Sequence, residues 1–247
     1  YAHNKILKRD EPLNRQYPNV STIGNPVNTI YGYISDGLIK EQAMLDAYDK
    51  THGFANFPLM PGDIKYKDIA DVNGNTDNVI NTNDRVAMGY PTVPEIIYGF
   101  GPSIKFKNLD FSFFFQGAAR TSLMMSGFHP FVGNSNTARR GVLDFVAENC
   151  WTTTNPNEFA KYPRLTSKDN LNNNQNSSYW LRDASFLKLK NAEIGYTIKN
   201  MRFYISGSNL LTISSFKLWD PEMGGGSGMK YPTQRTINFG FQMTINN

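Results

Sequence analysis

The sequence has little of the chemistry that most enzyme and metal sites require. It contains one cysteine, Cys150, so no disulfide can form within the chain and no cysteine-based metal site is available. The three histidines, His3, His52 and His129, lie far apart in sequence and show no metal-ligand spacing. No paired carboxylates, Gly-x-Ser-x-Gly motif or phosphate-binding loop can be found. We therefore expect a protein that is not an enzyme.

Long hydrophobic runs and strong charge of one sign are also missing. No stretch approaches the roughly 18 uncharged apolar residues that a transmembrane helix needs, which excludes a helical membrane protein. The formal net charge of +4 is spread along the 247 residues, and no basic block with interleaved aromatics supports binding to nucleic acid. The chain starts at Tyr1 without a signal-peptide pattern, so we expect any export signal to lie upstream.

Aromatic residues are abundant in a chain that is polar on average. There are 17 Phe and 13 Tyr, while the mean hydropathy is −0.46. This combination suits strands with one apolar face and one wet face, which occur in membrane β-barrels and in soluble β-sandwiches. Composition alone does not separate these two classes.

Residues 1–94 are expected to be mostly loops, with a short helix and few strands. Proline and asparagine leave room for at most one strand in the first thirty residues. The spacing of Ile39, Ala43 and Ala47 predicts a short helix within Leu38–Lys50. Pro58, Pro61 and Gly62 then end this helix and open a long polar stretch that runs to Pro94.

Residues 95–247 show the period-two alternation of strands. A hairpin is predicted over 96–116 with a tight turn at Lys107-Asn108, and further strands are predicted over 201–206 and 237–245. Long polar segments, 134–161 and 167–178, separate the strand regions, and a short amphipathic helix is predicted over 142–149. The alternating apolar residues are Ile96, Tyr98, Phe100, Ile104, Phe106, Leu109, Phe111, Phe113, Phe115, Met201, Phe203, Ile205, Ile237, Phe239, Phe241, Met243 and Ile245.

The residues opposite this apolar face are mostly Gly, Ser, Asn and Gln. Small uncharged polar residues suit a hydrated lumen, with the apolar face against lipid. A soluble sandwich would instead bury Phe111, Phe113, Phe239 and Phe241 against a second sheet. The pattern alone leaves both architectures open.

An Asp-rich loop offers oxygen ligands at alternate positions. Its candidates for a calcium loop are Asp71, Asn73, Asn75, Asp77 and Asp84. The loop lacks the glycine at position 6 and the glutamate at position 12 of an EF-hand. The other interpretation is a loop of Asx turns held by its own hydrogen bonds. No other cofactor is indicated.

Aromatic residues in predicted loops admit two interpretations. They could stack on sugar rings, or they could pack within loops and at a membrane interface. The residues concerned are Trp151, Tyr179, Trp180, Trp219 and Tyr231.

Several segments in register resemble the SusC/RagA family of TonB-linked outer-membrane transporters. They are 61–68 (PGDIKYKD) followed by 71–74 (DVNG), 109–117 (LDFSFFFQG), 162–165 (YPRL), 181–191 (LRDASFLKLKN), 204–212 (YISGSNLLT) and 220–222 (DPE). The resemblance covers the chain from about Tyr31 to its end.

The resemblance implies an all-β fold, namely the C-terminal part of a large antiparallel transmembrane β-barrel of roughly the 22-stranded type with long extracellular loops. It places residues 1–247 in this partial barrel, with the N-terminal plug domain absent from the sequence. It also implies import of an oligomeric nutrient across the bacterial outer membrane, a glycan being favoured over a peptide. The implied partners are a SusD-like surface lipoprotein, TonB acting through the plug, lipid and the oligosaccharide or peptide substrate. The rival hypothesis is a soluble secreted β-sandwich that binds glycans.

Overall fold

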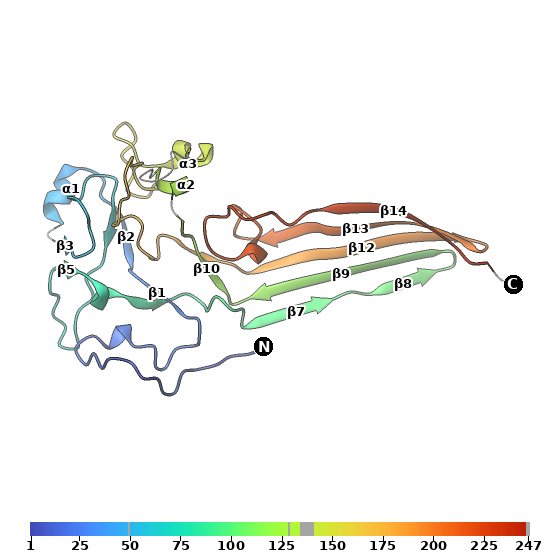
Figure 1. Cartoon of the computed structure of the whole chain (residues 1–247), viewed down its shortest axis with the longest axis horizontal. Helices are drawn as coiled ribbons and strands as arrows, with labels where there is room; N and C mark the ends of the chain where they lie inside the picture. Colours follow the sequence, from blue (N-terminus) through green and yellow to red (C-terminus); the bar gives the residue numbers. More distant parts are fainter. Residues whose placement is uncertain (49, 128, 134–140, 246–247) are drawn as a thin grey trace.

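The computed structural model describes residues 1–48, 50–127, 129–133 and 141–245, and it has two regions (Figure 1). A long antiparallel sheet, here called the wall sheet, extends from a loop-rich region that holds the hydrophobic core. The predicted polar loop over 134–161 includes residues 134–140, which lie outside the described residues. Among the described residues, no helix is long and apolar enough to cross a membrane.

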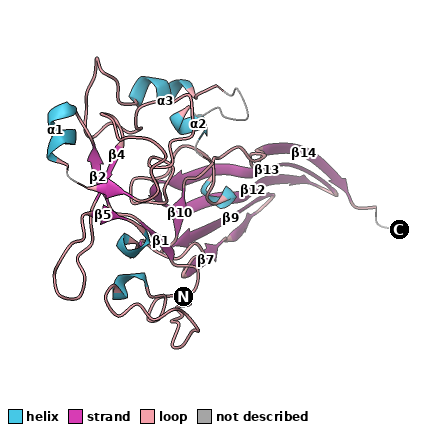
Figure 2. Ribbon diagram, turned by 60° about the vertical axis from the view of Figure 1, so that its left-hand side comes forward, coloured by secondary structure: helices cyan, strands magenta, loops and turns pink. Residues whose placement is uncertain are grey.

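The wall sheet contains six strands, and its long strands lie side by side in both ribbon views (Figures 1 and 2). Its order is β14-β13-β12-β9-β7, and β8 pairs with β9 beyond the end of β7. The strands are β7 (Ile96–Phe100), β8 (Ser103–Phe106), β9 (Leu109–Ala119), β12 (Phe186–Ile198), β13 (Met201–Ser214) and β14 (Thr236–Met243).

Two-residue turns close the hairpins at one end of the wall sheet. Lys107 and Lys199 each occupy the first position of such a turn, with φ angles of 54° and 53°. The predicted turn at Lys107-Asn108 is confirmed. At the other end the chain leaves the sheet for long excursions, 120–185 between β9 and β12 and 215–235 between β13 and β14.

Short strands and turns build the loop-rich region. The strand pairs are β1 (Ile30–Gly32) with β6 (Val86–Met88), β2 (Ser35–Leu38) with β4 (Ile64–Tyr66), β3 (Thr51–His52) with β5 (Val79–Ile80), and β10 (Ser122–Met124) with β11 (Leu181–Asp183). The helices are α1 (Gln42–Ala47), α2 (His129–Val132) and α3 (Asp144–Asn149), and the 3-10 turns are η1 (Pro18–Val20), η2 (Thr82–Asp84) and η3 (Pro221–Met223).

The short helix predicted within Leu38–Lys50 is confirmed, but it is shorter than that range. Leu38 ends strand β2, and helix α1 begins only at Gln42. Ala43 and Ala47 are exposed, because the strand and not the helix carries Leu38 into the core. The helix predicted over 142–149 is confirmed as α3, whose Val146 is buried.

Candidate functional site

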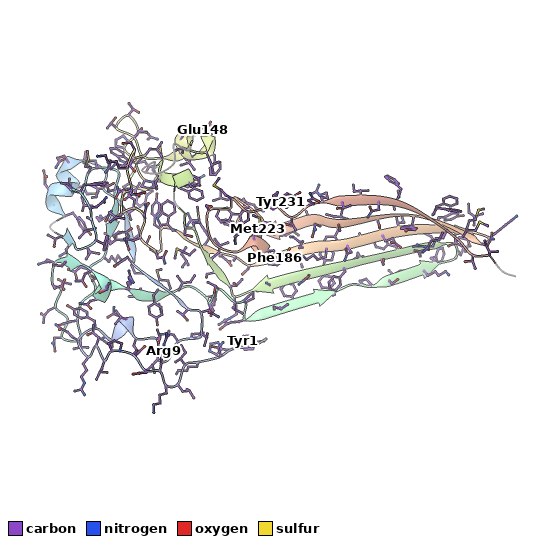
Figure 3. The ribbon with its side chains drawn as sticks, viewed as in Figure 1. Tyr1, Arg9, Glu148, Phe186, Met223 and Tyr231 are labelled. Carbon is purple, nitrogen blue, oxygen red and sulfur yellow. The ribbon has the colours of Figure 1, made fainter. Side chains whose placement is uncertain are left out.

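The wall sheet has one continuous apolar face that is open to its surroundings. Strand pairing places Phe203 between Tyr196 and Phe241. In the same way, Ile205 lies between Ile194 and Phe239, with 45% of Ile205 and 80% of Phe239 exposed. Figure 3 shows side chains projecting from both sides of these strands. Among the described residues no second sheet covers this face, which a sandwich would require.

The opposite face is polar and carries one charged cluster near the tight turns. Arg202 donates from Nε to Asp110 Oδ2 at 3.0 Å and from Nη2 to Glu193 Oε1 at 2.6 Å. The guanidinium reaches Asp110 across Gly195, where a Cβ atom would lie 2.4 Å from Arg202 Nη2. A glycine at this position therefore lets one arginine join residues from three strands. The other residues on this face include Ser112, Gln116, Ser206, Ser208, Asn238 and Gln242.

A buried carboxylate ties three loop segments together. Asp63 is 1% exposed and accepts hydrogen bonds from Arg164 Nε at 2.7 Å and Nη2 at 3.3 Å. Asn170 and Asn173 donate to the same Asp63 Oδ1 at 2.8 and 3.0 Å. Because removing one partner of a buried ion pair is strongly destabilising, this network fixes the relative positions of the loops.

A second buried charge joins the wall sheet to the loop after β13. Lys188 of β12 is 1% exposed and donates to the carboxylates of Asp220 and Glu222. Burial raises the pKa of Asp220, but hydrogen bonds from Lys188, Thr233 and the backbone of Glu222 outweigh burial and lower it overall. The predicted DPE segment thus anchors its loop to the sheet.

The loop aromatics mostly pack inside the core. Trp180 is fully buried, and Trp151 is 7% exposed. Trp219 packs edge-on against Phe216, with ring centroids 4.6 Å apart. Tyr231, in contrast, is 79% exposed and lies where the loops meet the wall sheet (Figure 3). Of the rings singled out in the sequence, Tyr231 is therefore the one most available for stacking on a ligand.

The Asp-rich loop is divided between an exposed turn and a buried turn. In the exposed turn, Asp71 Oδ1 accepts hydrogen bonds from the backbone N–H groups of Asn73 at 2.8 Å and Asn75 at 3.0 Å. Hydrogen bonds from three residues lower the pKa of Asp71 against an opposing effect of burial. The largest contribution comes from the backbone N–H of Asn75, followed by the Gln16 side chain and then by the backbone and side chain of Asn73. These contacts are those of an Asx turn.

In the buried turn, Asp84 accepts from the backbone N–H groups of Ile69 and Asn81, both at 2.7 Å. Asp77, which is exposed, accepts from the backbone N–H of Val79 at 2.9 Å. Across the described part of the chain, no three Asp, Glu, His or Cys side chains converge on a point that would hold a metal. The five residues proposed from the sequence therefore lie on two different turns.

Comparison with known proteins finds relatives that are named TonB-dependent receptors. The chain matches no family model. It is 31% identical to TonB-dependent receptor P26 of Formosa agariphila, over 90% of this chain and 23% of that receptor. It is 26% identical to TonB-dependent receptor SusC of Bacteroides thetaiotaomicron, over 70% of this chain and 17% of that receptor.

Solved structures share the fold. The RagAB peptide importer in its open-open state superposes with a TM-score of 0.64 at 21% identity, over 90% of this chain and 23% of that chain. The closed-closed state gives a TM-score of 0.63 at 22% identity, over 93% of this chain and 25% of that chain.

The fold and these likenesses define one class of protein: the wall sheet is part of a transmembrane-type β-barrel. The chain belongs to the SusC/RagA family of TonB-dependent receptors. It spans about a quarter of the length, or less, of the relatives it matches. The resemblance and the all-β fold expected from the sequence are thereby confirmed.

Proposed function

We propose that the full-length protein imports an oligomeric nutrient across the bacterial outer membrane, with energy supplied through TonB. The observation that carries this proposal is the wall sheet, whose apolar face is exposed and whose opposite face is polar. Outer-membrane barrels place apolar residues against lipid and polar residues in the lumen, with short turns on the periplasmic side. The two-residue turns and the long loops lie at opposite ends of the wall sheet in the same way (Figure 1).

The strand lengths support the same proposal. Strand β13 has 14 residues, which corresponds to about 46 Å of extended chain at roughly 3.3 Å per residue. A strand tilted by about 45° in a barrel needs only about 9–11 residues to cross the hydrocarbon core. The long strands therefore cross the membrane and continue into the extracellular loop region.

We further propose a SusD-like surface lipoprotein as the partner and a glycan as the first substrate candidate. The resemblance to the SusC/RagA family implies such a lipoprotein partner. The structural neighbour RagAB is named as a peptide importer, so a peptide is the second candidate. The polar lumen face, lined by hydroxyl and amide groups, offers hydrogen bonds to either kind of solute.

The rival function, a soluble sandwich that binds glycans, requires the phenylalanine face to be buried. Phe111 is 38% exposed, Phe239 80% and Phe241 54%. The exposure of these phenylalanine side chains therefore favours the barrel over the sandwich.

Uptake by cells tests the proposal. The full-length gene and its lipoprotein partner are expressed in a deletion background, and the uptake of labelled oligosaccharides and peptides is compared with and without functional TonB. We expect TonB-dependent uptake of at least one of the two classes. If no oligosaccharide or peptide enters in a TonB-dependent way, the proposed function is wrong.

A further inference from the structure

The apolar residues of β13 show where the bilayer lies along the wall sheet. They run from Phe203 to Ile213, and Ile213 is about half exposed. Ten steps of roughly 3.3 Å separate these two residues along the strand, which gives about 23 Å of height at a tilt of about 45°. The apolar band of an outer-membrane barrel is about 25 Å tall. The band therefore ends at Ile213, and the residues that follow lie at the height of the lipid headgroups.

A pocket of about 480 Å³, here called the rim pocket, lies where β13 ends and its long loop begins (Figure 1). The charged residues in its lining are Lys161, Arg182, Asp183 and Lys217, so three positive charges meet one negative charge. Strand β11 supplies Arg182 and Asp183, and loops supply the two lysines. Three segments that are distant in sequence thus build one basic pocket at the loop end of the wall sheet.

The alternation of exposure places the rim pocket on the apolar side of the wall sheet. Ile213 lies on the apolar face, where it pairs with Leu187 of β12. Beyond it Ser215 and Lys217 are exposed, whereas Phe216 between them is buried in the core. Ser215 and Lys217 both line the rim pocket and continue the side of the strand that faces lipid. The pocket therefore opens toward the headgroups and not into the lumen.

The basic side chains of the rim pocket have no carboxylate partner. Arg182 is half-buried, and its Nη1 donates to two backbone carbonyls, both at 2.8 Å, which leaves Nε and Nη2 without an acceptor among the described residues. Asp183 Oδ1 instead accepts the backbone N–H of Ser185 at 2.8 Å. No ion pair within the described part of the chain involves Lys161, Arg182 or Lys217. The pocket thus holds unneutralised positive charge and free donors, which suit an anion.

We propose that the rim pocket binds the phosphate group of an anionic lipid in the outer leaflet of the membrane. Arginine and lysine are the side chains that recognise phosphate, and basic pockets at membrane surfaces bind lipid headgroups. Ser215 lies about 5 Å in height beyond Ile213, within a headgroup region about 5–8 Å thick. The lining also includes Leu218, an exposed apolar side chain that favours a lipid over a free phosphate ion. The proposal rests on the membrane position of the wall sheet and is independent of the imported substrate.

Lipid binding to the full-length receptor tests the proposal. The receptor is purified in dodecyl maltoside and titrated with monophosphoryl lipid A, with the same lipid after removal of its phosphate, and with inorganic phosphate, and affinities are measured by microscale thermophoresis. A basic residue near an anionic lipid surface contributes about fivefold in binding. We therefore expect Lys217→Gln to weaken binding of the phosphorylated lipid about fivefold, and Lys161→Gln combined with Lys217→Gln to weaken it about 25-fold. The matched control is Lys168→Gln, because Lys168 is exposed in the same long excursion but does not line the rim pocket.

A melting experiment separates loss of binding from loss of folding. Without lipid, the double variant is expected to melt at the wild-type temperature, because both lysines are exposed. The phosphorylated lipid is expected to raise the melting temperature of the wild type more than that of the double variant.

Three results would overturn the proposal. The lipid without its phosphate could bind the wild type as tightly as the phosphorylated lipid, which would show that the phosphate is not recognised. Inorganic phosphate could bind as tightly as the phosphorylated lipid, which would make the pocket a site for free anions. Lys168→Gln could lose as much affinity as Lys217→Gln, which would indicate diffuse attraction to the surface. None of these results bears on TonB-dependent uptake, so failure of this proposal is distinguishable from failure of the proposed function.

Discussion

Two neighbouring residues of β13 provide a direct comparison between the faces of the wall sheet. Ile205 lies on the apolar face between Ile194 and Phe239, whereas Ser206 lies on the polar face between Glu193 and Asn238. Arginine on the lipid face of a barrel costs about 2–4 kcal/mol near the bilayer midplane. We therefore expect Ile205→Arg to reduce the folding equilibrium constant by about 30-fold to about 1,000-fold.

Ser206→Arg is the matched control, because it introduces the same side chain one residue away. Its guanidinium would lie beside Glu193 on the hydrated face, so we expect little change in stability. The assay is denaturant unfolding of the full-length barrel in lipid vesicles, followed by the heat-dependent shift in gel migration. Equal losses in the two variants, or a larger loss for Ser206→Arg, would refute the assignment of the two faces.

Three further perturbations test the packing and the loop network. Gly240→Val is expected to lower the free energy of unfolding by about 1–3 kcal/mol, because a Cβ atom there would lie 2.0 Å from Cζ of Tyr204. Gly141→Ala is the control in the same unfolding assay, because a Cβ atom at Gly141 would meet open space. Asp63→Ala is expected to cost about 3–5 kcal/mol by leaving its buried partners unpaired, and limited proteolysis should show faster cleavage of the loops. Burial lowers the pKa of His52, and a hydrogen bond with the side chain of Asn172 offsets this effect only in part. His52 therefore binds a proton more readily in the unfolded chain than in the folded one, and the stability of the loop region should fall as the pH drops below about 6.5. Hydrogen exchange measured at pH 5 and pH 7.5 should show this fall. The variant His52→Asn should not show it.

The sequence was most informative where a structural property is local. Period-two alternation predicted which residues of β7, β8, β9, β13 and β14 share a face, because side chains of a strand alternate irrespective of what they pack against. Strand β12 shows where this reasoning fails. Its register shifts between Leu189 and Asn191, so that Leu187 and Leu189 share a face with Ile194 and Tyr196. A bulge of this kind changes the parity in mid-strand and hides the pattern.

The loop region was harder to predict because burial there depends on distant contacts. Asp63 becomes buried through Arg164 and Asn173, about a hundred positions away, and no local pattern signals this. Trp180 is fully buried, but no feature of the neighbouring sequence indicates that this ring lies in the core.

The central claim is that the wall sheet lies in a bilayer with its phenylalanine face toward lipid. Spin labels placed singly at 201–207 of β13, in full-length receptor reconstituted in vesicles with Cys150 replaced by serine, test it directly. Their relaxation is compared with oxygen, which concentrates in lipid, and with a water-soluble nickel chelate. We expect labels at Phe203 and Ile205 to respond to oxygen and labels at Tyr204 and Ser206 to respond to the chelate. Uniform access of the chelate to all positions, or no alternation along the strand, would contradict the account.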